Sequence, residues 1–281
     1  MYKVERKLFF KNIAVVYKPV GHCVSLAQKY YKTLKKFFKS TVESIWVDDV
    51  KPGSLDKYDL IISIGGDGTL LRISWCLGDR PAFVLPVPCG RRTIFYEDLD
   101  KIPPEEIVKK LITGNFFVDK VEKINVTFSN KNYYALNEVT ILTNDFGRVL
   151  TTEVKILTPY NETSFYIEGD GIILSTSTGS SAYALSAGGS IIEPRIYGIL
   201  VTPVNPVNLN IKPIFLHMFA KIFIKPHGYT KIYIDGINID TLPPNTIIKV
   251  QQPNIYIRLI RVGIRRDMVK RVLESRITLF K

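Results

Sequence analysis

Apolar and polar positions over the first 115 residues follow a pattern that predicts strands and helices in turn. Runs rich in apolar residues at 13–19, 44–49, 60–64 and 82–87 predict four strands. Helical spacing at 23–38, a short helix after residue 69 that ends near Gly78, and a third from Pro103 to Gly114 lie between or after them. This alternation favours an α/β domain with a parallel sheet over residues 1–115.

After residue 116 the pattern changes to short β-rich runs separated by turn residues. KINVTF, TEVKIL, KIFIKP and KIYIDG are examples, and such runs predict a β-rich, antiparallel domain over residues 116–260. Residues 261–281 return to helical spacing. We expect this last stretch to be a C-terminal helical segment that folds back onto one of the two domains.

Composition and charge narrow the class of protein. With 281 residues, 46% hydrophobic and 23% charged, the chain is globular. The net charge of +12 suits polyanionic small molecules better than nucleic acid, because the basic residues are spread out and no nucleic-acid motif accompanies them. No run approaches the roughly 20 apolar residues that span a bilayer, and no signal peptide is recognisable. We therefore expect neither nucleic acid nor a membrane as partner.

The three cysteines bear on the compartment. Cys23, Cys76 and Cys89 have a spacing that fits neither a disulfide framework nor a zinc site. We expect a reducing, cytoplasmic location and no metal held by the protein alone.

Residues 60–73, LIISIGGDGTLLRI, place a carboxylate among glycines at the end of a predicted strand. Leu71 rules out a GxGxxG fingerprint, and no glycine in the chain is followed by lysine, which rules out a Walker A loop. The remaining interpretation is a strand-to-helix turn whose amides bind phosphate. Asp67 would then take a proton from an attacking hydroxyl or help to hold Mg²⁺. The alternative is that Asp67, with Thr69, only caps the helix.

A second candidate segment is EGDGIILSTSTGSSAYALSAGG, residues 168–189. Thr178, Ser180, Ser181 and Ser186 offer many donors and acceptors in little volume, which suits a neutral polar ligand such as an adenine–ribose unit. Tyr183 offers an aromatic face for a base. The alternative is an ordinary surface loop rich in serine and threonine.

The third candidate is ALNEVTI, residues 135–141, where Asn137 and Glu138 interrupt an apolar strand. Strand alternation predicts that one of the two is buried, and a buried polar group needs a partner. That partner is supplied either by the protein or by a ligand.

These three stretches, in this order, resemble the NAD kinase family, whose members phosphorylate NAD to NADP. The family's signatures are a GGDGT loop, an Asn-Asp or Asn-Glu pair, and a segment close to GDGxIxSTPTGSTAYxLSAGGPI. This chain has GGDGT at 65–69, NE at 137–138 and GDGIILSTSTGSSAYALSAGGSI at 169–191, and the similarity continues through 199–216. The resemblance therefore spans nearly the whole chain.

The resemblance implies transfer of a phosphoryl group from ATP or polyphosphate, with Mg²⁺, to the adenosine ribose 2′-hydroxyl of NAD. Asp67 would be the catalytic base. It also implies a homodimer or homotetramer in which a neighbouring subunit completes the site. The residues implied to bind phosphate are Gly65, Gly66, Thr69, Arg72 and Arg148. Those implied to bind substrate are Gly68, Asn137, Glu138, Asp170, Thr178, Ser181, Ala182, Tyr183, Ala184, Leu185, Ser186 and Asp235.

One segment departs from the family. Where members usually carry NxGxLGFL after the fourth strand, residues 88–98 are PCGRRTIFYED, with Thr93 in place of a glycine. A side chain there stands where backbone would pass close to a ligand. Two alternatives therefore stay open: a catalytically weakened homologue that binds dinucleotides, and a lipid or sugar kinase that shares the GGDGT loop.

Overall fold

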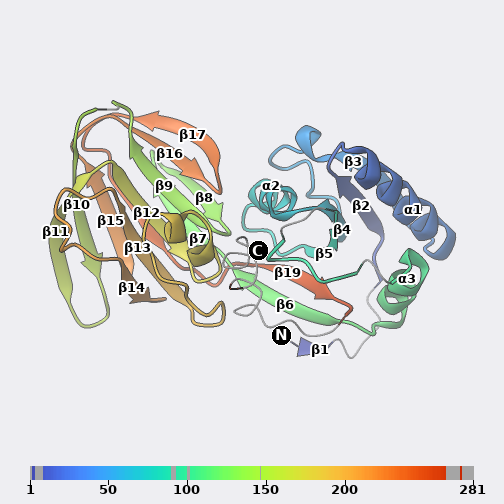
Figure 1. The fold of residues 1–281 in the computed structure, drawn as a ribbon. Helices are drawn as coiled ribbons and strands as arrows, with labels where there is room; N and C mark the ends of the chain where they lie inside the picture. The colour runs from blue at the N-terminus through green and yellow to red at the C-terminus, as the bar shows by residue number, and fades with distance from the viewer. Residues whose placement is uncertain are drawn as a thin grey trace. The chain divides into compact units, whose positions relative to one another are not determined.

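The structure is a computed structural model that describes residues 2–3, 9–89, 93–99, 102–145, 147–263 and Leu273. The chain divides into two compact units (Figure 1). The first comprises Met1–Val121 and Tyr256–Lys281, and the second comprises Glu122–Ile255. The domains expected from the sequence end at residues 115 and 260, whereas the units divide at residues 121 and 255.

The first unit is an α/β domain built on a seven-stranded sheet of order β1-β6-β19-β5-β4-β2-β3. Strands β2, β3, β4, β5 and β19 pair in parallel, and β1 pairs with β6 antiparallel. The predicted α/β domain is confirmed. Its elements are β1 (Tyr2–Lys3), β2 (Asn12–Tyr17), α1 (Gly21–Phe37), β3 (Thr41–Trp46), η1 (Val47–Asp49), β4 (Leu60–Gly65), α2 (Asp67–Leu77), β5 (Phe83–Pro88), α3 (Pro104–Thr113), β6 (Phe117–Glu122) and β19 (Tyr256–Arg261).

Local sequence explains most of these bounds. All six residues of β4 are buried, as expected for a central strand of a covered parallel sheet. Helix α3 has proline and two acids in its first turn and ends at Gly114, whose φ of 73° is left-handed. The predicted strand at 44–49 is shifted: β3 ends at Trp46, and a 3₁₀ turn with Asp48 and Asp49 follows.

The second unit consists of two six-stranded sheets, of order β11-β10-β15-β18-β7-β8 and β14-β13-β12-β9-β16-β17. The strand pairs described in them are antiparallel, which confirms the predicted β-rich domain. Its elements are β7 (Ile124–Phe128), β8 (Lys131–Ala135), β9 (Glu138–Thr143), β10 (Leu150–Leu157), β11 (Glu162–Gly169), β12 (Gly171–Thr176), η2 (Gly179–Ser181), α4 (Tyr183–Ser186), β13 (Gly198–Val204), β14 (Ile214–His217), β15 (Lys221–Pro226), β16 (Thr230–Ile234), β17 (Ile237–Leu242) and β18 (Ile248–Gln251).

The end of the chain differs from the sequence-based expectation. Strand β19 lies in the sheet of the first unit, between β6 and β5, and pairs in parallel with β5 through Arg258 and Leu259. It therefore does not extend the β-rich unit. The expected C-terminal helical segment, residues 261–281, falls almost wholly outside the described residues.

The cysteine prediction is wrong. Cys23 and Cys89 form a disulfide with a Cα–Cα distance of 5.7 Å, and Cys76 is buried and unbridged. The two partners are 66 residues apart in sequence and meet because α1 begins close to the end of β5. Because two of the three cysteines form a disulfide, cysteine usage no longer supports the expected reducing compartment. None of the helices within the described residues is long and apolar enough to cross a membrane.

Candidate functional site

The glycine-rich turn of the first unit connects a buried strand to a helix. Strand β4 ends at Gly65, Gly66 is the N-cap residue, and α2 begins at Asp67. A Cβ atom at Gly65 would lie 2.2 Å from the Thr69 hydroxyl oxygen, so only glycine lets Thr69 pack there. The Thr69 N–H donates to the Gly66 carbonyl at 2.9 Å. The turn therefore presents amides at the start of an 11-residue helix, a favourable place for phosphate oxygens.

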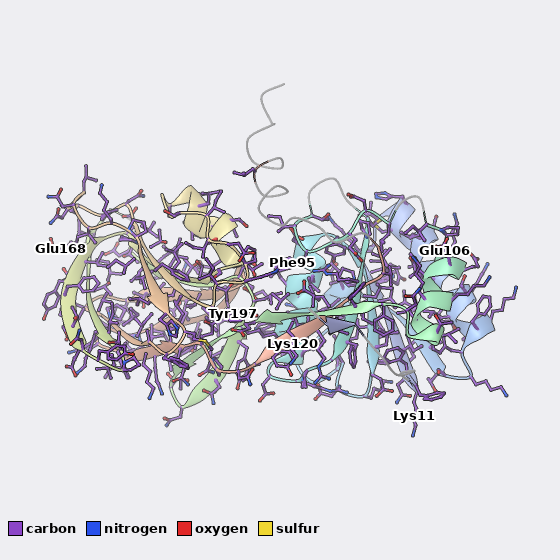
Figure 2. All side chains as sticks on the ribbon, turned by 90° about the horizontal axis from the view of Figure 1, so that it is seen from below. Lys11, Phe95, Glu106, Lys120, Glu168 and Tyr197 are labelled. Carbon is purple, nitrogen blue, oxygen red and sulfur yellow. A yellow bond between two sulfur atoms is a disulfide. The ribbon has the colours of Figure 1, made fainter. Side chains whose placement is uncertain are left out.

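The Asp67 carboxylate is oriented by backbone amides from the divergent segment. The Ile94 N–H donates to Oδ2 at 2.8 Å, and the Phe95 N–H donates to Oδ1 at 3.1 Å. Figure 2, which draws the side chains, labels Phe95 in the first unit. Because every residue type except proline supplies a backbone N–H, the changed side chains at Ile94 and Phe95 do not remove the contact.

Tyr96 contacts the glycine-rich turn and was not among the residues predicted from the sequence. Its side chain is fully buried, its hydroxyl donates to the Gly66 carbonyl at 2.8 Å, and it lies 2.9 Å from the Ser63 hydroxyl. Burial raises the pKa of the Tyr96 phenol far above its usual value, so it stays a neutral donor. The sequence held no local signal for this contact, because Tyr96 and Gly66 are 30 residues apart.

The far side of this segment is anchored to β19. The buried Arg261 side chain donates to the Phe95 carbonyl and pairs with Asp119 at 3.2 Å. The Glu97 carboxylate accepts the Val262 N–H at 2.9 Å, and burial raises the Glu97 pKa. Residues 93–99 are thus held to both the glycine turn and the end of β19.

The second unit brings two distant motifs together at Asp235. This residue lies in the turn between β16 and β17 with a left-handed φ of 48°. Its carboxylate accepts the N–H groups of Leu136 at 2.8 Å, Asn137 at 2.7 Å and Glu138 at 3.1 Å. Burial raises the Asp235 pKa to about 6, although the three amides act in the opposite direction. Asp235 therefore fixes the backbone that carries the Asn-Glu pair.

Glu138 is a buried acid with an open oxygen. Asn137 and Glu138 are 8% and 7% exposed, so both are buried, one more than strand alternation requires. The reason is that β9 begins at Glu138, and strand alternation does not apply to the residue before it. Burial, and next the charge of Asp235, raise the Glu138 pKa to about 8. Its Oε2 atom has no hydrogen-bond partner among the described residues, so it is a candidate to contact a ligand.

The serine- and threonine-rich segment packs directly on this pair. The Thr176 hydroxyl donates to the Leu136 carbonyl at 2.8 Å and accepts the Gly179 N–H at 2.9 Å. A Cβ atom at Gly179 would lie 2.1 Å from the Asn137 carbonyl oxygen. Glycine is therefore required for this close approach, which joins the two motifs into one cluster.

Several hydroxyls of the segment are used inside the protein. Ser180 donates to the Ser177 carbonyl at 2.6 Å, and Ser181 donates to the Thr178 carbonyl at 3.2 Å. Tyr183, by contrast, is 42% exposed. Among the predicted substrate-binding residues of this segment, Thr178, Ser181 and Ala184 are buried, Ala182 and Leu185 are partly buried, and Tyr183 and Ser186 are exposed.

Three predicted residues lie apart from these clusters or have other contacts. Asp170 precedes β12, so it is at the opposite end of that strand from Thr178, and its carboxylate accepts from Asn205 at 2.8 Å. Arg148 is 83% exposed and pairs with a neighbouring aspartate. Arg72, on α2, donates to the Val50 carbonyl at 3.1 Å.

Comparison with known proteins identifies the family. The N-terminal domain of the ATP-NAD kinases matches residues 6–116, and their C-terminal domain matches residues 136–262. The chain belongs to the ATP-NAD kinase family. A curated NAD kinase from Thermococcus sibiricus is 36% identical over 214 residues, which cover 74% of each chain. The NAD kinase of Caldicellulosiruptor bescii is 32% identical over 216 residues, 73% of this chain and 77% of that protein.

Solved structures agree on the fold. An NAD kinase from Archaeoglobus fulgidus, determined in complex with ATP, has a TM-score of 0.74 at 24% identity and covers 96% of this chain and 97% of its own. A yeast NADH kinase complexed with NADH has a TM-score of 0.80 at 19% identity and covers 98% and 89%. The two-unit architecture is thus that of the ATP-NAD kinase family, and the divergent segment 88–98 lies within it.

Proposed function

We propose that this chain transfers a phosphoryl group to the adenosine ribose 2′-hydroxyl of NAD and releases NADP. The observation that carries the proposal is the Asp67 carboxylate, held by two backbone amides at the first residue of a helix that follows a glycine turn. A carboxylate beside a phosphate-binding turn repels phosphate unless it acts on a proton or a cation. The family membership of the chain supplies the hydroxyl on which it acts.

Asp67 accepts the proton of the 2′-hydroxyl while the ribose oxygen attacks the terminal phosphorus of the donor. The bond between that phosphorus and the bridging oxygen breaks, and the shortened donor leaves. Gly65, Gly66, Gly68 and Thr69 hold phosphate oxygens at the helix N-terminus, with Thr69 contributing its hydroxyl because its N–H donates to the Gly66 carbonyl. Most of the rate comes from positioning and charge stabilisation, as is general for phosphoryl transfer. The donor is ATP or polyphosphate.

Magnesium fits this arrangement as a companion of the donor. Mg²⁺ prefers oxygen ligands and is usually bound by one or two carboxylates together with substrate phosphates. Among the described residues, the cluster of three possible metal ligands contains two sulfur atoms, which does not suit Mg²⁺. Mg²⁺ would then be held mainly by the donor phosphates, whose charge it would neutralise.

The cluster of the second unit is proposed to bind the nucleoside. Asn137 and the open oxygen of Glu138 would bind ribose and base, and Tyr183 would stack on a base. Asp235 would act on these groups through the backbone, because its carboxylate receives three amides. The further residues proposed to contact substrate or phosphate are Thr178, Ser181, Ala182, Ala184, Leu185, Ser186, Arg72 and Arg148.

The position of Asp170 supports an oligomer. It is exposed and lies at the far end of β12 from the nucleoside cluster, so within one chain it is badly placed to share a ligand with Thr178. We propose a homodimer or homotetramer in which Asp170 serves the site of a neighbouring copy. We also propose a cytoplasmic location, where a disulfide such as Cys23–Cys89 is usually transient. Light scattering during size-exclusion chromatography measures the assembly.

The decisive experiment compares Asp67→Asn with Asp56→Asn, which changes an exposed carboxylate of the same unit. NADP formation is assayed with NAD and NADH against ATP, other nucleoside triphosphates and polyphosphate, and NAD binding is measured by calorimetry. We expect Asp67→Asn to abolish turnover and to keep NAD binding, while Asp56→Asn behaves as wild type. Unchanged turnover of Asp67→Asn refutes the assigned role.

The same panel separates the two alternatives. Wild-type protein that binds NAD but turns over with none of the donors is a weakened homologue. Activity with diacylglycerol or a sphingoid base, and none with NAD, would indicate a lipid kinase.

A further inference from the structure

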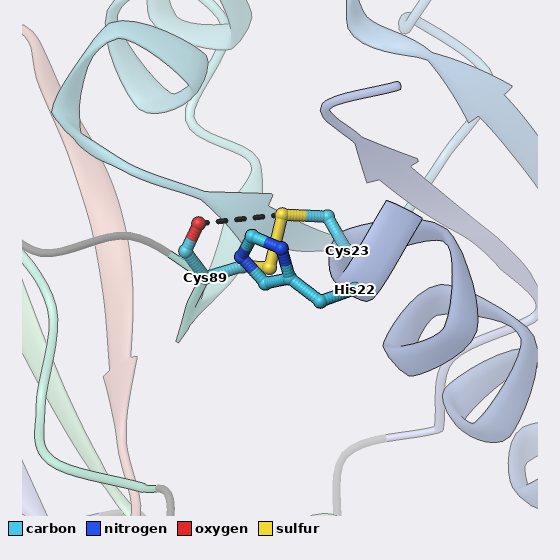
Figure 3. Close-up of side chains that lie close together, drawn as sticks. All are labelled: His22, Cys23 and Cys89. Atoms are coloured by element: carbon cyan, nitrogen blue, oxygen red, sulfur yellow. Dashed lines mark hydrogen bonds between the residues drawn. A yellow bond between two sulfur atoms is a disulfide. The ribbon is translucent and has the colours of Figure 1, made fainter. Parts of the chain in front are cut away.

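Three side chains with reactive or metal-binding atoms meet where α1 begins and β5 ends. They are His22, Cys23 and Cys89, and their ligand atoms all lie within 4.8 Å of one another (Figure 3). Cys23 and Cys89 are joined as a disulfide, and the Cys23 sulfur lies 3.3 Å from the Cys89 carbonyl oxygen. Cys23 is fully buried, Cys89 is partly buried, and His22 is exposed. None of the three has a part in the phosphoryl transfer described above.

We propose that Cys23 and Cys89 form a reversible thiol–disulfide site that exchanges with small thiols and disulfides. While the disulfide is formed, it restrains residues 93–99, the segment whose amides orient Asp67. The proposal depends on the proposed function only for its effect on turnover. Its structural part stands on the positions of the two cysteines and of residues 93–99.

The backbone is already placed for the bond. The Cα–Cα distance of 5.7 Å is within the usual range for disulfides of about 4.4 to 6.8 Å. The third cysteine provides a contrast: Cys76 is buried on α2, and burial raises the pKa of its thiol to about 11. Cys76 is therefore an unreactive thiol and a natural control.

Accessibility decides which sulfur is attacked. Cys23 is fully buried in the first turn of the 17-residue helix α1, whereas Cys89 is only partly buried. An incoming thiolate therefore reaches the Cys89 sulfur, and Cys23 is the sulfur expelled. The N-terminus of α1, which has no acidic side chain in its first turn, favours the negative charge that Cys23 then carries.

The partly buried Cys89 is then the sulfur that a small thiolate attacks. A bond forms between the reagent sulfur and Cys89, the Cys23–Cys89 bond breaks, and Cys23 leaves as a thiolate. A second small thiolate attacks the reagent sulfur of this mixed disulfide. It releases the Cys89 thiolate and a small-molecule disulfide, which carries away the two oxidised sulfurs. Oxidation is the same sequence in reverse, with a small disulfide as oxidant.

Cys89 is coupled to Asp67 by a short path. Its N–H donates to the Gly65 carbonyl at 2.8 Å, in the turn that carries Asp67. Further along the same segment, the Ile94 and Phe95 amides bind the Asp67 carboxylate. The disulfide fixes the start of this segment to α1, so breaking it removes one of the restraints on the two amides.

A metal site is the less favoured use of the same atoms. Structural zinc takes four ligands, whereas the group formed by the described residues has three. While the sulfurs are bonded to each other, neither is available as a thiolate ligand. The covalent use needs only the two cysteines.

The test uses the full chain after treatment with oxidised glutathione or with dithiothreitol. Alkylation and mass spectrometry count free thiols, and hydrogen–deuterium exchange follows the peptide that contains residues 93–99. We expect one free thiol, that of Cys76, in the oxidised protein and three in the reduced protein. Exchange of residues 93–99 should be faster after reduction in wild type and in Cys76→Ser, and the same under both treatments in Cys89→Ser.

Turnover is measured on the same samples. We expect reduction to lower kcat for NADP formation by about 3- to 10-fold in wild type and in Cys76→Ser, because small displacements of a reacting group are costly. Cys89→Ser should stay at the reduced level under both treatments. Three free thiols after oxidation, or identical exchange of residues 93–99 in the two states, would overturn the proposal. Both outcomes are read without any kinase assay, so they are distinct from a failure of the proposed function.

Discussion

Replacing Glu138 by glutamine removes a buried acid whose ionisation opposes folding. The side chain is 7% exposed, its Oε2 atom has no hydrogen-bond partner among the described residues, and its pKa in the folded protein is about 8. In the unfolded chain the pKa is near 4.5. Glutamine has nearly the same shape and stays neutral at every pH, so Glu138→Gln isolates the charge.

The sign and size follow from proton linkage. Because the folded pKa lies above the unfolded one, the stability contributed by neutral Glu138 is complete below pH 4.5 and is lost as pH rises through 8. Between pH 5 and pH 8 this loss is on the order of 3 to 4 kcal/mol. The free energy of unfolding of Glu138→Gln should therefore gain that amount relative to wild type over the same interval.

The assay is urea unfolding of both proteins at several pH values from 5 to 8.5. Both tryptophans, Trp46 and Trp75, belong to the first unit, so far-UV circular dichroism must report the β-rich unit. Glu168→Gln is the matched control, because Glu168 is an exposed glutamate on β11 of the same unit. It should give a stability curve parallel to wild type. Parallel curves for wild type and Glu138→Gln would refute the reasoning, since they would show that Glu138 does not change its protonation on folding.

Three further changes probe the packing of the site. Gly179→Ala should destabilise the β-rich unit by about 2 kcal/mol or more in urea unfolding, because its Cβ would lie 2.1 Å from the Asn137 carbonyl oxygen; wild-type stability would contradict that contact. Tyr96→Phe should cost about 1 to 3 kcal/mol in thermal unfolding by leaving its buried partners unsatisfied, and an unchanged melting temperature would exclude this. Cys23→Ser should lose about 4 kcal/mol relative to the oxidised protein, as expected for a loop of 66 residues, and the difference should disappear when wild type is reduced.

Local patterns were enough for the elements and for three motifs. Each of three features depends on a few consecutive residues and can therefore be predicted from the local sequence. They are the apolar run at β4, the proline and acids of α3, and the glycine turn before α2. The cluster formed by Asn137 and the serine- and threonine-rich segment was also expected, through the family resemblance.

Contacts between residues far apart in the sequence could not be predicted from local patterns. The amides that hold Asp67 come from 27 and 28 residues later, and Arg261 reaches Phe95 across 166 residues. The side chains of segment 88–98 depart from the family pattern, whereas its contact with Asp67 is made by the backbone. The disulfide could not be predicted either, because a pairing over 66 residues depends on the order of strands in the sheet.

The place of β19 has a consequence for how the chain is made. The sheet of the first unit has β19 between β6 and β5, yet β19 begins at Tyr256, after the whole of Glu122–Ile255. During synthesis, the first unit therefore lacks an interior strand of its sheet until the whole second unit has been translated. The β-rich unit is contiguous in the chain, whereas the Asp67 segment gains its Arg261 anchor only after that unit has been synthesised.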